Sequence, residues 1–347
     1  MFYVGLDVHA KSIVICVLTE FGKVYQRCTV RQIDQMLQFL EGLGGPFQVC
    51  FEASLDYGVL DEMLSQIAER VVVAHPGKLN AIYRSKRKND RNDAELLAKL
   101  LYIDAVPIVH VPSGRVRAWR ELITFRTRLV QKRTRAKNAV RALLRSLRIV
   151  VPCKMGLWTC KGLAWLRALS FDNEMHALKR DLLLDEITNL NVQIFRVEKE
   201  LARFAAKSPA VALLRTIPGV GPRTAEAVVA FLDDPKRFAR SKQVGAYFGI
   251  VPSQDQSGPV NRLGHITKQG PATVRHLLTE AVWQAVRRSP TVKAYLERVQ
   301  RGDPARKKIA IVATAHYLVR VMWSMLKTGS KWQEQVTVQE EERLMTA

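Results

Sequence analysis

The sequence has few acidic residues, few cysteines and no long apolar run. Of its 347 residues, 32 are Asp or Glu and 54 are Lys or Arg, so the formal net charge is +22. A folded chain with this excess is expected to bind a polyanion, with nucleic acid ahead of a membrane surface. The absence of about 18 consecutive uncharged apolar residues argues against a transmembrane span. The N-terminus lacks the basic and apolar regions of a signal peptide, so no secretory signal is expected.

The five cysteines are odd in number and widely spaced (Cys16, Cys28, Cys50, Cys153 and Cys160). No two of them form a C-x-x-C pair, so neither a disulfide framework nor a structural zinc site is expected. This usage is typical of a cytoplasmic protein with reduced thiols. The hydrophobic share of 48% argues against a disordered chain, and the length predicts two or three domains.

Residues 1–112 have the pattern of an α/β domain. The expected strands span residues 2–6, 12–19, 24–30, 47–52 and 70–74, and the expected helices lie around 36–43 and over 59–68. Three strands joined by turns, followed by alternating strands and helices, predict a mixed sheet with helices packed on it. This is the chain order of the RNase H-like fold.

Residues 113–207 are expected to form two long helices. The first is strongly basic: twelve Lys or Arg residues lie between 115 and 148, where Glu121 is the one acid. Its charged side is either a solvated surface or a face that follows the phosphates of a nucleic acid. Arg126 and Arg133 interrupt the apolar seam of this helix.

The second of these helices, expected over 173–206, shows a heptad repeat. Its apolar residues follow alternating steps of four and three, which is a coiled-coil pattern (Leu183, Ile187, Leu190, Ile194, Val197, Leu201 and Phe204). The pair of helices either serves only as a spacer between domains or also brings two chains together.

A third, mostly helical region covers residues 208–330, and an acidic tail follows over 331–347. Within it, I-P-G-V-G (217–221) lies between two apolar helical segments, which is a helix-hairpin-helix pattern. Gly219 and Gly221 would let backbone N–H groups approach a phosphate at a helix N-terminus. The same turn also serves for plain helix packing, and both interpretations stay open.

Four acidic residues have the placement of a metal site. Asp7 ends the first strand, Glu52 ends the strand 47–52, and Asp90 and Asp93 form a D-x-x-D on one face of a helix. Such carboxylates can hold two hard cations, which stabilise the attacking and leaving oxygens in phosphodiester displacement. Asp90 and Asp93 could instead complement a helix dipole, but the order of the three elements in one α/β unit favours the metal site.

The segment 249–270 is rich in glycine and polar residues and is expected to be a loop. Ser253 and Ser257 lie in it, together with Arg262, His265 and Lys268. A serine beside cations could attack a phosphodiester, because the cations would stabilise the charged transition state. From spacing alone, a serine in a loop is more often a turn residue.

Six segments together resemble the DEDD transposases of insertion sequences, the insertion sequence 110 family, also called bridge-RNA-guided recombinases. They are G-L-D-V-H-A (5–10), F-E-A-S (51–54), K-N-D-R-N-D-A (88–94), I-P-G-V-G-P (217–222), Y-F-G-I-V-P (247–252) and S-G-P-V-N-R-L-G-H-I-T-K-Q-G (257–270). They span nearly the whole chain in the family's order, and the set is far more specific than any one piece.

The resemblance implies a RuvC-like N-terminal domain over 1–112, a coiled-coil hairpin over 113–207 and a C-terminal transposase domain over 208–330. Position by position, the four acids correspond to a tetrad that binds Mg²⁺ or Mn²⁺, and Ser257 corresponds to a serine nucleophile that becomes joined to DNA. Members often have two serines before the following glycine, whereas Gln256 stands there in this chain, so Ser253 remains the second choice.

The resemblance also implies the partners. A structured guide RNA would direct recombination between donor and target double-stranded DNA, and the protein would act as a dimer to tetramer that combines one protomer's tetrad with another's serine. RNA contacts are then expected at Arg126, Lys132, Arg133 and Arg135. Nucleic-acid contacts in the C-terminal region are expected at Gly219, Gly221, Arg262 and Lys268.

Two other functions fit parts of the sequence. A RuvC-like nuclease or junction resolvase would use metal-activated water and would leave no protein–DNA adduct. An architectural protein would bind nucleic acid without chemistry, and Asp7→Asn would leave its activity unchanged. The transposase is favoured because the architectural function gives the acidic tetrad no purpose.

Overall fold

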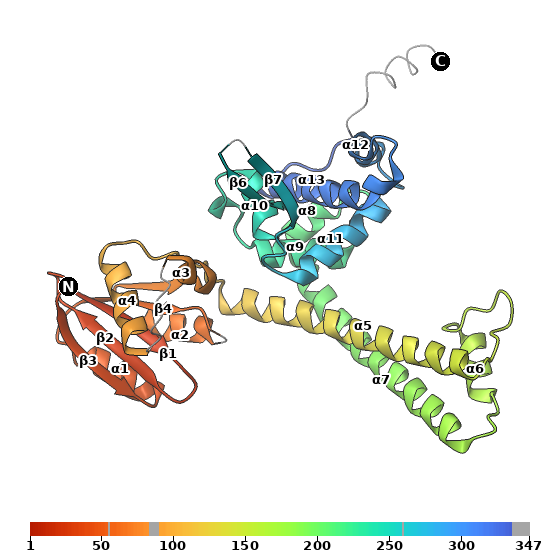
Figure 1. The fold of residues 1–347 in the computed structure, drawn as a ribbon, viewed down its shortest axis with the longest axis horizontal. Helices are drawn as coiled ribbons and strands as arrows, with labels where there is room; N and C mark the ends of the chain where they lie inside the picture. Colours follow the sequence, from red (N-terminus) through yellow and green to blue (C-terminus); the bar gives the residue numbers. More distant parts are fainter. Residues whose placement is uncertain (55, 83–89, 259, 335–347) are drawn as a thin grey trace, which may run out of the picture. The chain divides into compact units, whose positions relative to one another are not determined.

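The computed structural model describes residues 1–54, 56–82, 90–258 and 260–334. The chain divides into two compact units, Met1–Arg117 and Ala118–Ala347, which Figure 1 shows in sequence colours. The predicted acidic tail lies outside the described residues from position 335 onward.

The first unit is built on a mixed five-stranded sheet. Its strands are β1 (Phe2–Val8), β2 (Ile13–Leu18), β3 (Val24–Val30), β4 (Phe47–Glu52) and β5 (Arg70–Ala74), in the order β3-β2-β1-β4-β5. The first three strands pair antiparallel, and β4 and β5 then extend the sheet parallel to β1. This mixed α/β arrangement is consistent with an RNase H-like domain, and all five strands were expected from the sequence.

Helices cover both faces of this sheet. On one face, α1 (Ile33–Glu41) and α2 (Tyr57–Leu64) share a core with alternate residues of β1 and β4. On the other face lie α3 (Pro76–Ile82) and α4 (Asp90–Tyr102). The helix predicted over 59–68 begins two residues earlier and ends at Leu64, and α3 was not predicted.

Two long helices begin the second unit and lie side by side (Figure 1). They are α5 (Gly114–Ser146), whose first residues belong to the first unit, and α7 (Glu174–Ala205); the short α6 (Cys160–Ala168) lies in their connection. Leu129 packs against Leu190 and Ile194, while Arg126 reaches Glu198, so the two helices run antiparallel. The heptad residues of α7 therefore face α5 of the same chain.

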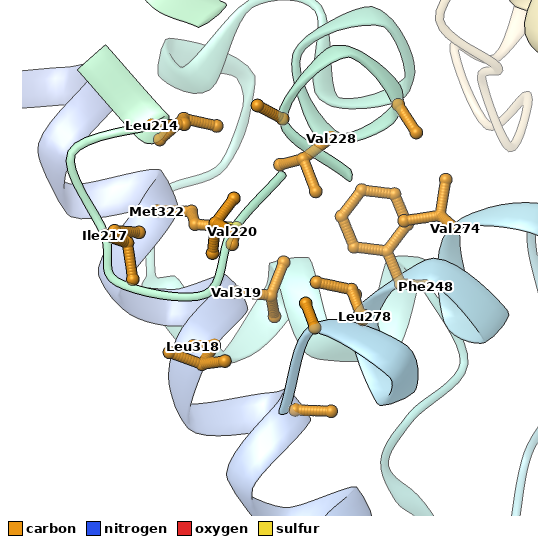
Figure 2. Packing of buried hydrophobic residues seen from close by; sticks show 14 of the residues in the cluster. Leu214, Ile217, Val220, Val228, Phe248, Val274, Leu278, Leu318, Val319 and Met322 are labelled. Atoms are coloured by element: carbon orange, nitrogen blue, oxygen red, sulfur yellow. The ribbon is translucent and has the colours of Figure 1, made fainter. Parts of the chain in front are cut away.

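The C-terminal helices surround one hydrophobic core. They are α8 (Pro209–Leu214), α9 (Pro222–Leu232), α10 (Ser241–Tyr247), α11 (Ala272–Ala285), α12 (Pro290–Gln300) and α13 (Lys307–Thr328). Figure 2 shows Ile217 and Val220, from the turn between α8 and α9, beside the helix that carries Val319. This helical region is the mostly α-helical part that the sequence predicts.

The helix α13 is long and apolar enough to count as a candidate membrane span on length and composition alone, with a mean hydropathy of 1.5. In this fold it is a core helix, because residues such as Ala315, Leu318 and Met322 are fully buried among neighbouring helices. A buried core helix passes the same test, so α13 is weak support for a membrane location.

The segment expected to be a loop contains a two-stranded hairpin. Strand β6 (Pro252–Ser257) pairs antiparallel with β7 (Val260–Ile266), and Figure 1 shows them as a small separate sheet. The loop expectation, which rested on the glycines and polar residues of this segment, was wrong, because an exposed strand needs no apolar alternation. All six residues of β6 are exposed, so no buried face produces that alternation.

Candidate functional site

Asp7 and Glu52 lie at the ends of two neighbouring parallel strands. The last paired residues of these strands are Leu6 and Phe51, and the two acids follow directly. Leu6 and Phe51 point into the core under α1 and α2, so the next residue of each strand points to the opposite face. Both carboxylates therefore belong to the face that α4 covers.

A glycine brings α4 close to this part of the sheet. A Cβ atom built on Gly5 would lie 2.0 Å from the backbone oxygen of Ala94 and 2.5 Å from the nitrogen of Ala98. Only a residue without a side chain permits this approach of helix to strand. Asp93 directly precedes Ala94, so the contact brings the first turn of α4 near the end of β1, where Asp7 lies.

The four predicted acids differ in their surroundings. Asp7 is nearly buried, and its Oδ2 lies 3.1 Å from Nε2 of His9. Glu52 is exposed and Asp93 is half-buried. Asp90 is the first residue of α4, and its side chain lies outside the described part of the chain. Among the described side chains, no three acidic, histidine or cysteine groups gather closely enough to hold a metal ion.

The chemistry of these donors nevertheless fits a divalent cation. Carboxylate oxygens are the ligands that Mg²⁺ prefers, and the backbone places three of the four acids on one side of the sheet. The resemblance noted from the sequence implies such a metal, and Asp7, Glu52, Asp90 and Asp93 are the residues that would hold it. Burial raises the pKa of the Cys50 thiol to about 12 and also raises that of Cys16, so neither thiol is readily ionised.

Ser257 is the last residue of β6 and is exposed at the turn of the hairpin, before Gly258. Ser253 lies at the opposite end of the strand, where its Oγ would be 2.5 Å from a Cβ atom on Gly264. The hydroxyl of Ser253 thus packs against the partner strand. Arg262 and Lys268 are both exposed in the same segment.

The two glycines of the turn between α8 and α9 have different roles. Gly219 has φ +86°, and a Cβ atom there would lie 2.3 Å from the backbone nitrogen of Ala285 in α11. It is therefore required for packing. Gly221 is exposed, caps the N-terminus of α9 and has nothing within 4 Å of its Cβ position. Of the two, only Gly221 has room for a phosphate.

Glu226 in α9 is a buried acid that the sequence analysis missed. Its side chain is 1% exposed, and Arg223 Nη1 lies 2.9 Å from its Oε2 without the alignment of a hydrogen bond. Burial raises the pKa of Glu226 to about 7, against the opposing effect of Arg223 and Arg126. The sequence feature that could have identified Glu226 is a single acid on the buried side of an otherwise apolar helix.

Several basic residues of α5 are engaged within the chain. Arg126 pairs with Glu198, Arg133 Nη1 donates to Asn191 at 2.9 Å, and Lys137 and Arg141 lie over the ring of Trp158. Burial and the nearby Arg133 and Arg141 lower the pKa of Lys137. In contrast, Lys132 and Arg135 are exposed.

The predicted site residues thus fall into two groups. The four acids belong to the first unit, while Ser257, Arg262, Lys268 and the glycine turn belong to the second. Within the first unit, Asp7 and Glu52 follow the last paired residues of two neighbouring parallel strands, and Asp93 lies in the first turn of α4. Within the second, Ser257 and the glycine turn lie on separate elements.

Comparison with known protein families gives two matches in chain order. Residues 4–149 match the DEDD family of IS110 elements, described as Transposase. Residues 211–297 match the family described as Transposase IS116/IS110/IS902. The first match contains all four predicted acids, and the second contains the glycine turn and the β6–β7 hairpin.

Curated relatives cover almost the whole chain. The transposase for insertion sequence element IS1328 of Yersinia enterocolitica is 27% identical, over 94% of this chain and 97% of the relative. The transposase for IS1111A of Coxiella burnetii is 28% identical, over 93% and 88%. A pilin gene-inverting protein of Moraxella lacunata is 22% identical, over 96% and 98%.

Proposed function

The chain belongs to the IS110 family of insertion-sequence transposases, which are enzymes that cleave DNA and transfer its strands. We propose that it is an RNA-guided recombinase with a serine nucleophile. The observation that carries the proposal is the sheet edge of the first unit. There, Asp7 and Glu52 follow the last paired residues of β1 and β4, on the face against which α4, with its D-x-x-D, is packed. A divalent metal held by these acids would stabilise charge on the phosphate oxygens.

In the proposed reaction, Oγ of Ser257 attacks a DNA phosphorus. The Oγ–P bond forms as the P–O bond to the leaving strand breaks, and the serine proton ends on the hydroxyl of that strand. Attack of a hydroxyl from another strand on the phosphoserine reverses this exchange and frees the serine. Ser257 is supported over Ser253 because it lies at the tip of the hairpin, whereas the hydroxyl of Ser253 packs against Gly264 of the partner strand.

Guide RNA is proposed to bind along the exposed side of α5. Lys132 and Arg135 are the best-supported phosphate contacts, because both are exposed while Arg126 and Arg133 have partners on α7. A structured RNA is a polyanion that would neutralise much of the charge excess of +22. We place the protein in the cytoplasm, as its cysteine usage suggests.

Oligomerisation is proposed through the outer side of α7. Large apolar side chains remain exposed there although the heptad seam is filled by α5 (Met175, Leu178, Leu182, Val192 and Phe195). A second chain covering this side would bury apolar area and bring one protomer's acids to another's serine. We propose a dimer to tetramer assembled through this side of α7.

A metal-dependent nuclease of RuvC type is the second candidate. It is favoured by the same sheet edge, because carboxylate-bound metals can also activate water for phosphodiester hydrolysis. In that case Ser257 has no chemical role. The two candidates differ in whether a covalent protein–DNA species forms.

The test is adduct formation on DNA that matches the RNA copurifying with the protein. With Mg²⁺, the wild type is expected to give a DNA adduct that survives denaturant. Ser257→Ala should abolish the adduct, whereas Ser253→Ala should retain it as the matched control. Asp7→Asn should reduce the rate by at least about a hundredfold. Cleavage without an adduct in the wild type would favour the nuclease.

A further inference from the structure

The β6–β7 hairpin is anchored at its base and exposed along its length. At the base, Arg275 Nη1 donates to the backbone oxygens of Gln269 and Gly270 at 2.8 and 2.9 Å. Beyond it, every described residue from 252 to 265 is exposed. A two-stranded ribbon without a covered face is marginal in water, so a partner is expected to cover one of its faces.

One face of this ribbon carries a row of amides. Gln256 lies opposite Asn261 and Gln254 lies opposite Leu263, which places these four side chains on the same side. Gln254 Nε2 donates to Asn261 Oδ1 at 3.0 Å and to Gln256 Oε1 at 3.3 Å. The three amides therefore hold one another in place. None of the four side chains on this side is charged.

After these contacts between the three amides, some of their polar atoms can still bind a further partner. Within the described part of the chain, Gln254 Oε1 has no hydrogen bond, and neither do Gln256 Nε2 and Asn261 Nδ2. These atoms provide one acceptor and two donors on an exposed surface. Asn and Gln amides pair in this way with the N7 acceptor and N6 donor of adenine in the DNA major groove.

We propose that the amide face of the β6–β7 ribbon enters the major groove of the DNA substrate and contacts base edges near the cleaved phosphodiester. The major groove admits a two-stranded ribbon, and the exposed His265 and Lys268, which follow the amide row along the chain, carry groups suited to the phosphate walls. Arg262 lies opposite Asp255 on the other side of the ribbon. Ser257 belongs to the other side of the ribbon, at the turn. The inference rests on the proposed function, since it makes the reacting DNA the partner.

The consequence is a sequence preference that the protein itself imposes, in addition to base pairing with a guide RNA. This preference should cover one or two base pairs, because Gln256 and Asn261 can reach no more than that from one face of the ribbon. Each well-formed amide–adenine contact is expected to favour the correct base about tenfold or more.

The test uses the full chain with its copurifying RNA. DNA duplexes with randomised base pairs beside the cleavage position are selected for binding and, separately, for adduct formation, and both pools are sequenced. The wild type is expected to prefer adenine about tenfold at one or two positions. Gln256→Ala and Asn261→Ala should each reduce that preference toward uniform at one position. Gln66→Ala, an exposed amide in the first unit, should leave it unchanged.

A second variant separates base contact from ribbon stability. Gln256→Glu keeps the side-chain shape but presents only acceptors, so its preference should move from adenine toward cytosine. If Gln256→Glu loses all base preference without a shift toward cytosine, the ribbon is disordered in the variant and the inference is overturned.

The outcomes also separate this inference from the proposed function. Unchanged base preferences in all three variants, in a protein that still forms adducts, would overturn the inference alone. A wild type that binds DNA with an adenine preference but forms no adduct would remove the serine mechanism and keep the base contact. Variants that lose RNA binding rather than DNA preference would assign the amide face to RNA.

Discussion

The charge state of Glu226 depends strongly on the fold. Its side chain is buried in α9, and burial raises its pKa from 4.5 to about 7. Between these values the folded protein holds a proton that the unfolded chain releases, so stability falls as the pH rises. The loss is complete once the pH passes the folded-state pKa, near 7. The total effect is about 3 kcal/mol.

We therefore expect Glu226→Gln to be more stable than the wild type at pH 8 and nearly equal to it at pH 4.5. Thermal unfolding followed by circular dichroism over this pH range measures the difference. Glu121→Gln, at an exposed glutamate of α5, is the control and should keep the wild-type profile. A wild-type melting temperature that rises between pH 5 and pH 7, relative to Glu226→Gln, would contradict the assignment.

Gly5 sets the distance between the sheet and the helix that carries Asp93. Because a Cβ atom there would overlap the backbone of α4, Gly5→Ala should destabilise the protein by about 1 to 3 kcal/mol. It should also weaken Mg²⁺-dependent DNA cleavage by displacing Asp93 from the end of β1. Unfolding by denaturant and the Mg²⁺ dependence of cleavage measure the two effects.

Gly45→Ala is the matched control for Gly5→Ala. A Cβ atom at Gly45 meets only the ring of Phe2 at 3.5 Å, which is an ordinary contact. This variant should keep both stability and cleavage. Equal behaviour of the two variants would show that the approach of α4 does not depend on glycine.

At the scale of elements, the five strands of the first unit were predictable and the two strands of the β6–β7 ribbon were not. The runs 47–52 and 70–74 were identified with their observed ends, because continuous apolar stretches bounded by turn residues predict buried strands. The ribbon β6–β7 has no buried face and carries no such pattern. The heptads of α7 predicted a seam but could not tell whether the same chain or another one fills it.

The same limit applied to individual site residues. Asp7 and Glu52 were predicted as strand-end acids, and the parallel pairing of β1 with β4 makes them neighbours. Arg126 was expected to contact phosphate, but its guanidinium is only 22% exposed beside Glu198. Sequence spacing gives the face of a helix on which a residue lies, while its ion-pair partner depends on which helix packs there.

The exposed side of α5 gives a prediction about salt dependence. A plot of log affinity for the copurifying RNA against log salt concentration should be less steep by about two in the double variant Lys132→Ala/Arg135→Ala. The reason is that each lost phosphate contact removes the release of roughly one counterion. Filter binding at several salt concentrations measures the slope. Arg126→Ala should change the slope little and should lower the melting temperature instead. An unchanged slope in the double variant would place the RNA elsewhere.

For the whole molecule, the outer side of α7 predicts self-association. Leu178 and Leu182 are 59% and 60% exposed and lie one helical turn apart. Replacing both with Asp should reduce the molar mass of the protein–RNA complex in light scattering toward that of one protomer. Lys179→Ala, an exposed neighbour outside the apolar row, should leave the mass unchanged. A wild type that is already monomeric at micromolar concentration would refute this surface as an interface.

The antiparallel helices α5 and α7 form an arm whose tip is the connection that contains α6. Their pairing allows the length of this arm to change only in fixed steps. Seven residues added to each helix keep every seam residue facing its partner and carry the tip outward by about 10 Å. An insertion of three or four residues would instead turn the tip around the arm axis and move Lys132 and Arg135 relative to whatever they bind. Helix pairs of related proteins can therefore differ in reach by whole heptads while they present the same basic side.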